Sequence, residues 1–304
     1  MNYQQIINEI YQKAKNKPDT GVVASYIPEL GKVHPDNFGI CLKTIEGECF
    51  GVGDFQKKFS IQSISKVLTF TLALKILGAE LWKRVGMEPS GDPFNSLVQL
   101  EVENGTPRNP LINSGAIVVC DVLISHLKNP KQELLAFVRK LADNSQINYT
   151  KKVVDSEKSF GFKNTAHANL IKSFGNIEND IDQVLDLYYH ACSLEMTCKE
   201  VSDVFLYLAN GGVSPHTNET IISLGRSKRI NATIQLCGLY DEAGEFAFKV
   251  GLPGKSGVGG GIVAIHPGKY CIAVWSPKLN NKGNSKKGFK VLELFTTATE
   301  LSIY

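Results

Sequence analysis

Several features that would assign this sequence to a specialised class are missing. Its 304 residues contain no run of the roughly 18 apolar residues that a membrane-spanning helix needs, since lysines close the apolar stretch 67–74 at both ends. The N-terminal segment is amphipathic and contains Glu9, without the continuous apolar core or the small-residue cleavage site of a secretory signal. We therefore expect a cytoplasmic protein that does not associate with membranes.

An excess of charge of one sign is also missing. Lysine and arginine total 33 and aspartate and glutamate total 30, so the net charge is +3. This balance does not favour nucleic acid as a partner. The lysine-rich stretch 278–290 is interrupted by asparagine and glycine and has no aromatic ladder. It predicts a solvated loop.

Cysteine and histidine are present without the spacing of a disulfide framework or a metal site. The seven cysteines are odd in number and form no C-x-x-C pair, so most of them are expected to be reduced core residues. They are Cys41, Cys49, Cys120, Cys192, Cys198, Cys237 and Cys271. The six histidines are scattered along the chain. We expect no metal site.

The remaining composition is that of a globular protein, with 43% hydrophobic and 21% charged residues. Strand patterns lie near both ends of the chain and helical patterns fill its middle. The strands are predicted as a hairpin over 38–45 and 48–53, and as the segments 246–251, 260–267 and 270–277, with a Pro-Gly turn at 267–268. Helices are predicted at 4–16, 61–78 (ended by Gly78), 116–127, 132–142, 181–191, 199–209 and 285–302.

This order predicts an α/β (α+β) fold. An antiparallel sheet is built from both chain ends, and a helical region is inserted in sequence between them. We expect residues 1–70 and 226–304 to form the sheet domain, and residues 71–225 to form the helical domain.

A serine and a lysine stand three residues apart at the start of the apolar helix at 61–78. Residues i and i+3 share a helical face, so the Lys66 amine would lie beside the Ser63 hydroxyl. A serine hydroxyl needs a base to become a nucleophile, and a lysine with a depressed pKa can serve as that base. Backbone N–H groups at the helix start can also stabilise an oxyanion.

A second motif strengthens this interpretation. Lys255, Ser256 and Gly257 follow each other in a glycine-rich segment that enters the C-terminal strands. The order S-x-x-K, then K-[ST]-G is the signature of β-lactamases and penicillin-binding proteins. Their S-D-N motif is missing, and the nearest match, residues 202–204, lies in a helical stretch. The glycine cluster at 257–261 is not a phosphate-binding loop, because G-x-x-x-x-G-K-[ST] is absent.

Longer motifs resemble one family, the serine-dependent glutaminases, in their short bacterial form. The resemblance runs from about residue 26 to residue 277 and implies a β-lactamase/transpeptidase-like fold. The motifs are YIPEL (26–30), FSIQSISK (59–66), VGMEPSGDPFNS (85–96), NPLINSGAI (109–117), SEKSFGFKN (156–164), LDLYYHACS (185–193) and CGLYDEAGEFAFKVGLPGKSGVGGGI (237–262).

The resemblance also implies the site residues. Ser63 is similar to the family's nucleophile, Lys66 to its general base, and Tyr240 to the tyrosine that passes a proton to the leaving ammonia. Val258 matches the residue whose backbone N–H completes the oxyanion hole with that of Ser63. The substrate-binding residues implied are Tyr26, Ser63, Asn113, Glu157, Asn164, Tyr188, Tyr240 and Val258. Ser114 and Lys163 depart from the family's more usual alanine and arginine, beside the site rather than in it.

The expected function is therefore hydrolysis of L-glutamine to L-glutamate and ammonia through a serine acyl-enzyme, without a cofactor. Glu157 would bind the α-ammonium of glutamine, and the amides and tyrosines would orient it. The resemblance also implies a homo-oligomer, a dimer or a tetramer. Two alternatives stay open: another serine acyl hydrolase such as a β-lactamase or D,D-peptidase, and a catalytically inactive relative that only binds an amino acid.

Overall fold

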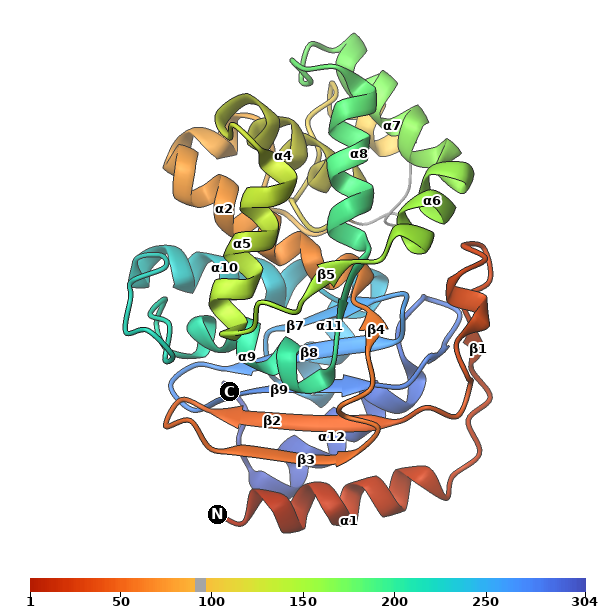
Figure 1. Cartoon of the computed structure of the whole chain (residues 1–304), viewed down its shortest axis with the longest axis vertical. Helices are drawn as coiled ribbons and strands as arrows, with labels where there is room; N and C mark the ends of the chain where they lie inside the picture. Colours follow the sequence, from red (N-terminus) through yellow and green to blue (C-terminus); the bar gives the residue numbers. More distant parts are fainter. Residues whose placement is uncertain (91–96) are drawn as a thin grey trace.

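A computed structural model of the chain describes residues 1–90 and 97–304. Figure 1 shows a sheet with helices on both faces, and above it a group of helices formed by the middle of the chain. Both chain ends lie at the sheet. Residues 91–96, the last part of the motif at 85–96, lie outside the described residues.

The central sheet has five antiparallel strands in the order β3-β2-β9-β8-β7. Its strands are β2 (Gly39–Thr44), β3 (Cys49–Gly53), β7 (Gly254–Gly257), β8 (Gly261–His266) and β9 (Tyr270–Trp275). Because β2 pairs with β9, the N-terminal hairpin and the C-terminal strands form one sheet. The predicted antiparallel sheet from both chain ends is confirmed.

Two short sheets flank the central one. β1 (Val22–Val23) pairs with β10 (Lys278–Leu279), and β6 (Leu194–Met196) lies between β4 (Phe59–Ser60) and β5 (Asn148–Tyr149). The β4 pairing connects the segment just before Ser63 to the end of the helical region. The β1–β10 pair brings the N-terminal segment beside the C-terminal loop that follows β10.

Each face of the central sheet buries a different set of side chains. Ile40 and Leu42 of β2 belong to an apolar cluster with α1 (Tyr3–Lys15) and α12 (Lys286–Thr299), whereas Cys41 belongs to the cluster on the other face. This alternation follows from the two-residue period of a strand. The other face is covered by α9 (Cys198–Ala209). The predicted domain division assigns α9 to the helical region, and its boundaries stay a prediction.

The helical region surrounds α2 (Lys66–Leu77), which is buried along nearly its whole length. A helix that is apolar on all sides needs partners on all sides, and α2 packs against α4 and α5. Gly78 ends it with a φ of 59°, as expected of a glycine after a helix. The other helices are α3 (Val98–Val102), α4 (Asn113–His126), α5 (Pro130–Ala142), α6 (Lys151–Phe160), α7 (Phe162–Ser173), α8 (Ile181–Cys192), α10 (Leu224–Cys237) and α11 (Ala243–Lys249).

Two sequence predictions are wrong in part. Residues 246–251 are predicted as a strand, but most of them belong to helix α11. The prediction fails because the pattern of a short apolar segment does not distinguish a strand from a helix. The stretch 278–290 is not one solvated loop. It starts in β10, and its last residues begin α12. Asn284 and Ser285 between them are fully buried.

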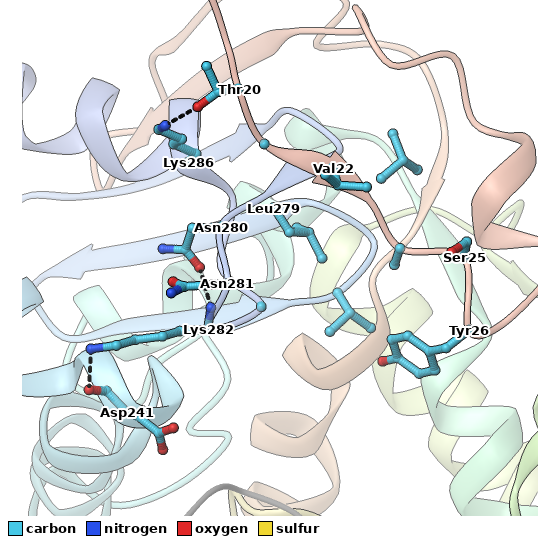
Figure 2. Close-up of a pocket in the computed structure, with 15 residues that line it drawn as sticks. Thr20, Val22, Ser25, Tyr26, Asp241, Leu279, Asn280, Asn281, Lys282 and Lys286 are labelled. Atoms are coloured by element: carbon cyan, nitrogen blue, oxygen red, sulfur yellow. Dashed lines mark hydrogen bonds between the residues drawn. The ribbon is translucent and has the colours of Figure 1, made fainter.

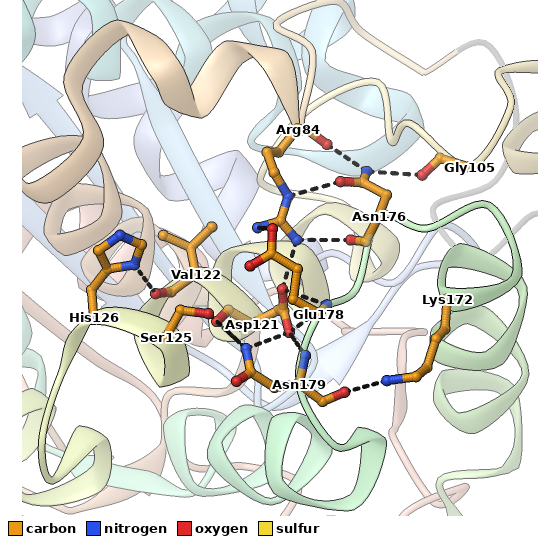
Figure 3. Close-up of polar contacts among 10 residues, drawn as sticks. All are labelled: Arg84, Gly105, Asp121, Val122, Ser125, His126, Lys172, Asn176, Glu178 and Asn179. Atoms are coloured by element: carbon orange, nitrogen blue, oxygen red, sulfur yellow. Dashed lines mark hydrogen bonds and ion pairs between the residues drawn. The ribbon is translucent and has the colours of Figure 1, made fainter.

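A buried ion pair that sequence analysis missed joins three segments of the helical region (Figure 3). Arg84 donates to the Asp121 carboxylate over 2.6 Å, and the Asn179 backbone N–H donates to the same carboxylate over 2.9 Å. Asn176 accepts from Arg84 and donates back to its carbonyl. Burial opposes ionisation of Asp121, yet the hydrogen bonds from Arg84 and Asn179 hold its pKa below the usual range.

Candidate active site

Ser63 and Lys66 lie together at the start of α2. Ser63 belongs to a 3-10 turn, η2 (Gln62–Ser65), and Lys66 is the first residue of the α-helix. The Lys66 backbone N–H donates to the Ser63 carbonyl, so the turn closes between the two residues. Gln62 has a φ of 51°, in the left-handed region that side chains other than glycine rarely adopt. Both side chains of the pair are buried.

The Lys66 ammonium contacts neutral oxygens. Nζ donates to the Asn113 side-chain oxygen over 2.6 Å and to the Leu111 carbonyl over 3.3 Å. Among the described residues, no carboxylate forms an ion pair with it. Burial lowers the pKa of Lys66 to about 8. The amine can therefore lose its proton close to neutral pH.

The turn before α4 brings these acceptors to Lys66. The Asn109 side chain accepts from the backbone N–H groups of Leu111 and Ile112, which bends the chain just before Asn113. A Cβ atom at Gly115 would lie 1.9 Å from the Asn109 carbonyl oxygen, so only glycine allows this close approach. The motif at 109–117 thus forms a compact turn whose end faces Lys66.

Asn113 links the lysine to the predicted substrate-binding residues. Its Nδ2 donates to the Asn164 side-chain oxygen over 3.0 Å. Asn164 stands in the first turn of α7, which follows α6 directly through Gly161. A Cβ atom at Gly161 would lie 2.0 Å from the Tyr189 hydroxyl, so this glycine lets α6 and α7 approach α8 closely.

Glu157 of α6 is a buried carboxylate that lies close enough to Lys66 for the two charges to interact. Burial raises the pKa of Glu157 to about 7, against the opposing effects of a hydrogen bond from Gln62 and the charge of Lys66. Tyr188 of α8 is also buried, and Lys66 Nζ lies 5.9 Å from its ring centroid. The structure thus brings Asn113, Asn164, Glu157 and Tyr188 around Lys66.

Tyr240 approaches this centre from the sheet side. It begins the 3-10 turn η4 (Tyr240–Glu242) with a φ of 53°. Burial raises the pKa of Tyr240 to about 12, and hydrogen bonding with the hydroxyls of Ser63 and Ser256 opposes this rise. The fully buried Lys255 lies under its ring, with Nζ 4.5 Å from the ring centroid.

The end of β7 packs directly on the turn that carries Ser63. A Cβ atom at Gly257 would lie 2.4 Å from the Ile61 carbonyl oxygen and 3.3 Å from the Ser63 backbone nitrogen. Glycine is therefore required here, and Val258 follows it at once. This contact supports the placement of Val258 beside Ser63, while its role in an oxyanion hole stays a prediction.

Tyr26 has 59% of its surface exposed, unlike the buried residues of the site, yet it lies close enough to Tyr240 and Glu157 for both to raise its pKa. Together with Val258 it lines a cavity of about 860 Å³ between the segment 20–26 and the loop after β10 (Figure 2). Gly283 also lines this cavity, and a Cβ atom there would lie 3.8 Å from the Tyr240 ring and 3.9 Å from the Val258 side chain. The cavity therefore reaches the Tyr240 side of the candidate site.

Sequence analysis missed several residues that support the site. Ser256 and Lys255 belong to a motif that predicts no separate role for either, and the sequence pattern does not point to Asn109, Glu242 or Asn284. Asn109 and Glu242 lie in the family motifs at 109–117 and 237–262, but Asn284 lies in the stretch predicted as a solvated loop. Only its burial in the folded chain reveals it.

The family model described as Glutaminase matches residues 21–304. The chain belongs to the glutaminase family. A glutaminase of Saccharophagus degradans is 58% identical to it over 304 residues, which cover 100% of this chain and 99% of the relative. A glutaminase of Aliarcobacter butzleri is 54% identical over 305 residues, with 100% of both chains covered.

Solved structures of glutaminases share this architecture. A probable glutaminase superposes with a TM-score of 0.93 at 34% identity, over 99% of this chain and 97% of that one. A probable glutaminase from Bacillus subtilis, solved with 6-diazo-5-oxo-L-norleucine, gives a TM-score of 0.85 at 29% identity, over 99% and 95%. The predicted β-lactamase-like fold is confirmed.

Two further observations concern the described residues of this glutaminase. Every helix among them is too short or too polar to cross a bilayer. Their histidine, cysteine, aspartate and glutamate side chains form no group of three that could hold a metal ion.

Proposed function

We propose that this glutaminase hydrolyses L-glutamine to L-glutamate and ammonia through a glutamyl ester on Ser63. The observation that carries the proposal is the environment of Lys66, a buried amine with a lowered pKa, held by two neutral oxygens one turn from a buried serine. A serine hydroxyl is a poor nucleophile until a base removes its proton. In this proposal Lys66 is that base.

The hydrogen bonds of Lys66 suit this role. A neutral amine has two N–H bonds and one lone pair. The Asn113 oxygen and the Leu111 carbonyl can accept from the two N–H bonds. The lone pair is then available for the proton of Ser63 as its oxygen attacks the side-chain amide carbon of glutamine.

The oxyanion that forms in this attack would lie between the backbone N–H groups of Ser63 and Val258. The packing of Gly257 on the Ser63 turn supports this assignment. Tyr240, kept protonated by its raised pKa, would donate a proton to the leaving nitrogen, and ammonia would depart. Water then attacks the ester by the reverse proton path, and Ser63 is regenerated.

Substrate recognition would rest on charge and on amide hydrogen bonds. Glu157 is the acidic residue of the shell, and the α-ammonium of glutamine would compensate its buried carboxylate. Asn113, Asn164 and Tyr188 surround the same space from α4, α7 and α8. Tyr26 would close the site from the cavity side.

The test measures ammonia release from glutamine by the wild type and by Ser63→Ala. The variant should lose nearly all activity. Incubation with 6-diazo-5-oxo-L-norleucine, followed by peptide mass spectrometry, should show an adduct on Ser63 in the wild type. The solved complex of a relative with this compound supports its choice as the probe.

The same assays separate the alternatives. A β-lactamase or D,D-peptidase would hydrolyse a chromogenic cephalosporin and release no ammonia from glutamine. An inactive amino-acid-binding relative would bind glutamine without turnover and without the Ser63 adduct. Full activity of Ser63→Ala would contradict the proposed mechanism.

A cytoplasmic location and a homo-oligomer, a dimer or a tetramer, also remain proposals. The seven cysteines are free thiols, six of them buried, which is compatible with a reducing compartment. Cell fractionation tests the location, and light scattering on the purified protein tests the number of subunits.

A further inference from the structure

The loop between β10 and α12 contains a fully buried asparagine that connects two parts of the candidate site. Asn284 Nδ2 donates to the Leu239 carbonyl over 3.1 Å and to the Glu242 carboxylate over 2.5 Å. Its side-chain oxygen accepts from the Ser256 hydroxyl over 2.6 Å. Both N–H groups and the oxygen of the side chain therefore have hydrogen-bond partners within the protein.

These bonds join the turn that holds Tyr240 to strand β7. Leu239 directly precedes Tyr240 and Glu242 is the last residue of η4, whereas Ser256 lies on β7 beside Gly257. The side chains of Ser256 and Ser63 both oppose the rise that burial causes in the pKa of Tyr240, so both lie close to its hydroxyl. Asn284 thus holds the elements on both sides of the Tyr240 hydroxyl.

Glu242 fixes the orientation of this asparagine. Its buried carboxylate accepts from Asn280 Nδ2 over 3.0 and 2.8 Å as well as from Asn284. No ion pair to a lysine, arginine or histidine is formed by Glu242 in the described part of the chain. Because a carboxylate only accepts hydrogen bonds, it directs the Asn284 amide nitrogen toward itself and the amide oxygen toward Ser256.

The backbone of Tyr240 needs such support. Its φ of 53° lies in the left-handed region, which is unfavourable for a residue with a side chain and persists only when the surroundings impose it. The hydrogen bonds of Asn284 to Leu239 and Glu242 hold the residues on both sides of this strained position.

We propose that Asn284, oriented by Glu242, is a positioning residue that holds Tyr240 in place for proton transfer to the leaving group. The inference rests on the proposed function, because it assigns Tyr240 the role of proton donor. Asn284 thus acts on Tyr240, the proposed proton donor to the leaving nitrogen, and not on the residues proposed to bind glutamine. Glu157, Asn113 and Asn164 lie on other elements, so glutamine binding should change little when Asn284 is lost.

The experiment compares Asn284→Ala with the control Asn8→Ala, an exposed asparagine on α1 outside the candidate site. Asn284→Ala should lower kcat by about 100-fold, the loss expected when a catalytic group is misplaced by about 1 Å, with KM within about threefold of the wild type. The control should keep the wild-type kcat. Labelling of Ser63 by 6-diazo-5-oxo-L-norleucine should stay stoichiometric in both, which shows that the nucleophile is intact.

A double variant distinguishes positioning from general damage. Tyr240→Phe/Asn284→Ala should be no slower than Tyr240→Phe alone, because residues that act through one group are not additive. Losses that multiply, or a wild-type kcat in Asn284→Ala, would overturn the inference. If Asn284→Ala does not fold, Glu242→Gln provides the second test with an expected loss of about tenfold in kcat, and a wild-type kcat there would equally overturn it.

The proposed function fails in a different way. Absence of a Ser63 adduct in the wild type contradicts the acyl-enzyme, and a wild-type kcat in Tyr240→Phe contradicts the proton-donor role. If kcat falls in Tyr240→Phe but stays at the wild-type value in Asn284→Ala, the proposed function stands and only the positioning role of Asn284 is contradicted.

Discussion

Lys66 donates a hydrogen bond to the Asn113 side-chain oxygen over 2.6 Å, although the two residues are 47 positions apart in sequence. Asn113 in turn donates to Asn164 over 3.0 Å. A single amide thus contacts both the proposed base and the proposed substrate-binding residues. In the proposed mechanism, this arrangement would couple the position of glutamine to the position of the base.

The Ser63–Lys66 pair should behave as one catalytic unit. Ser63→Ala and Lys66→Ala should each remove nearly all activity, and the double variant should be little worse, because each residue is useless without the other. The measurement is kcat/KM for ammonia release by the three variants. Losses that multiply would show that the two residues do not work together.

The rate should increase with pH in the range where Lys66 loses its proton. The base must be neutral, and burial lowers the pKa of Lys66 to about 8, so kcat/KM should rise through an apparent pKa near 8. The measurement is a pH–rate profile between pH 6 and 10. A profile that is flat from pH 6 to 9 would argue against Lys66 as the base.

Glu157 should bind the α-ammonium of glutamine through an ion pair. Glu157→Gln should bind glutamine more weakly, by about 2–5 kcal/mol, because the ammonium loses its buried partner. The sharper measurement compares glutamine with 4-carbamoylbutanoate, which has no α-amino group. The wild type should strongly prefer glutamine, and the variant should lose much of that preference.

If Glu157→Gln prefers glutamine over 4-carbamoylbutanoate as strongly as the wild type does, Glu157 does not bind the α-ammonium. The raised pKa of about 7 adds a second check, since bound ammonium favours the ionised carboxylate. Glutamine binding should therefore weaken as the pH falls through 7. Binding to the Glu157→Gln variant should lack this dependence.

The Arg84–Asp121 pair should be a major contributor to stability. Asp121→Asn should lower the free energy of unfolding by about 3 kcal/mol, because it leaves the partly buried Arg84 without its main partner. The neighbouring Lys83 forms an exposed pair with Glu80, so Lys83→Ala should cost less than about 1 kcal/mol. Urea unfolding of the two variants measures both values, and equal losses would contradict the argument.

The sequence by itself determined the local elements and predicted the candidate reactive pair. The spacing of Ser63 and Lys66 on an apolar helix, the hairpin at 38–53 and the strands at 260–277 depend on patterns within a few residues. Helical and strand periods are properties of neighbouring positions, so they can be read without the fold. The long motifs then led to the glutaminase family, which the comparisons confirm.

Tertiary structure alone decided which of these residues meet and how they are buried. Three sets of contacts join segments that are far apart in sequence. They are the hydrogen bonds of Lys66 to its acceptors, the pairing of Arg84 with Asp121 and the hydrogen bonds of the buried Asn284. Tertiary structure also made 246–249, most of the segment 246–251 that the local pattern predicts as a strand, part of helix α11. Burial and long-range hydrogen bonds arise only when the chain is folded, and these determine the pKa values and positions on which the chemistry depends.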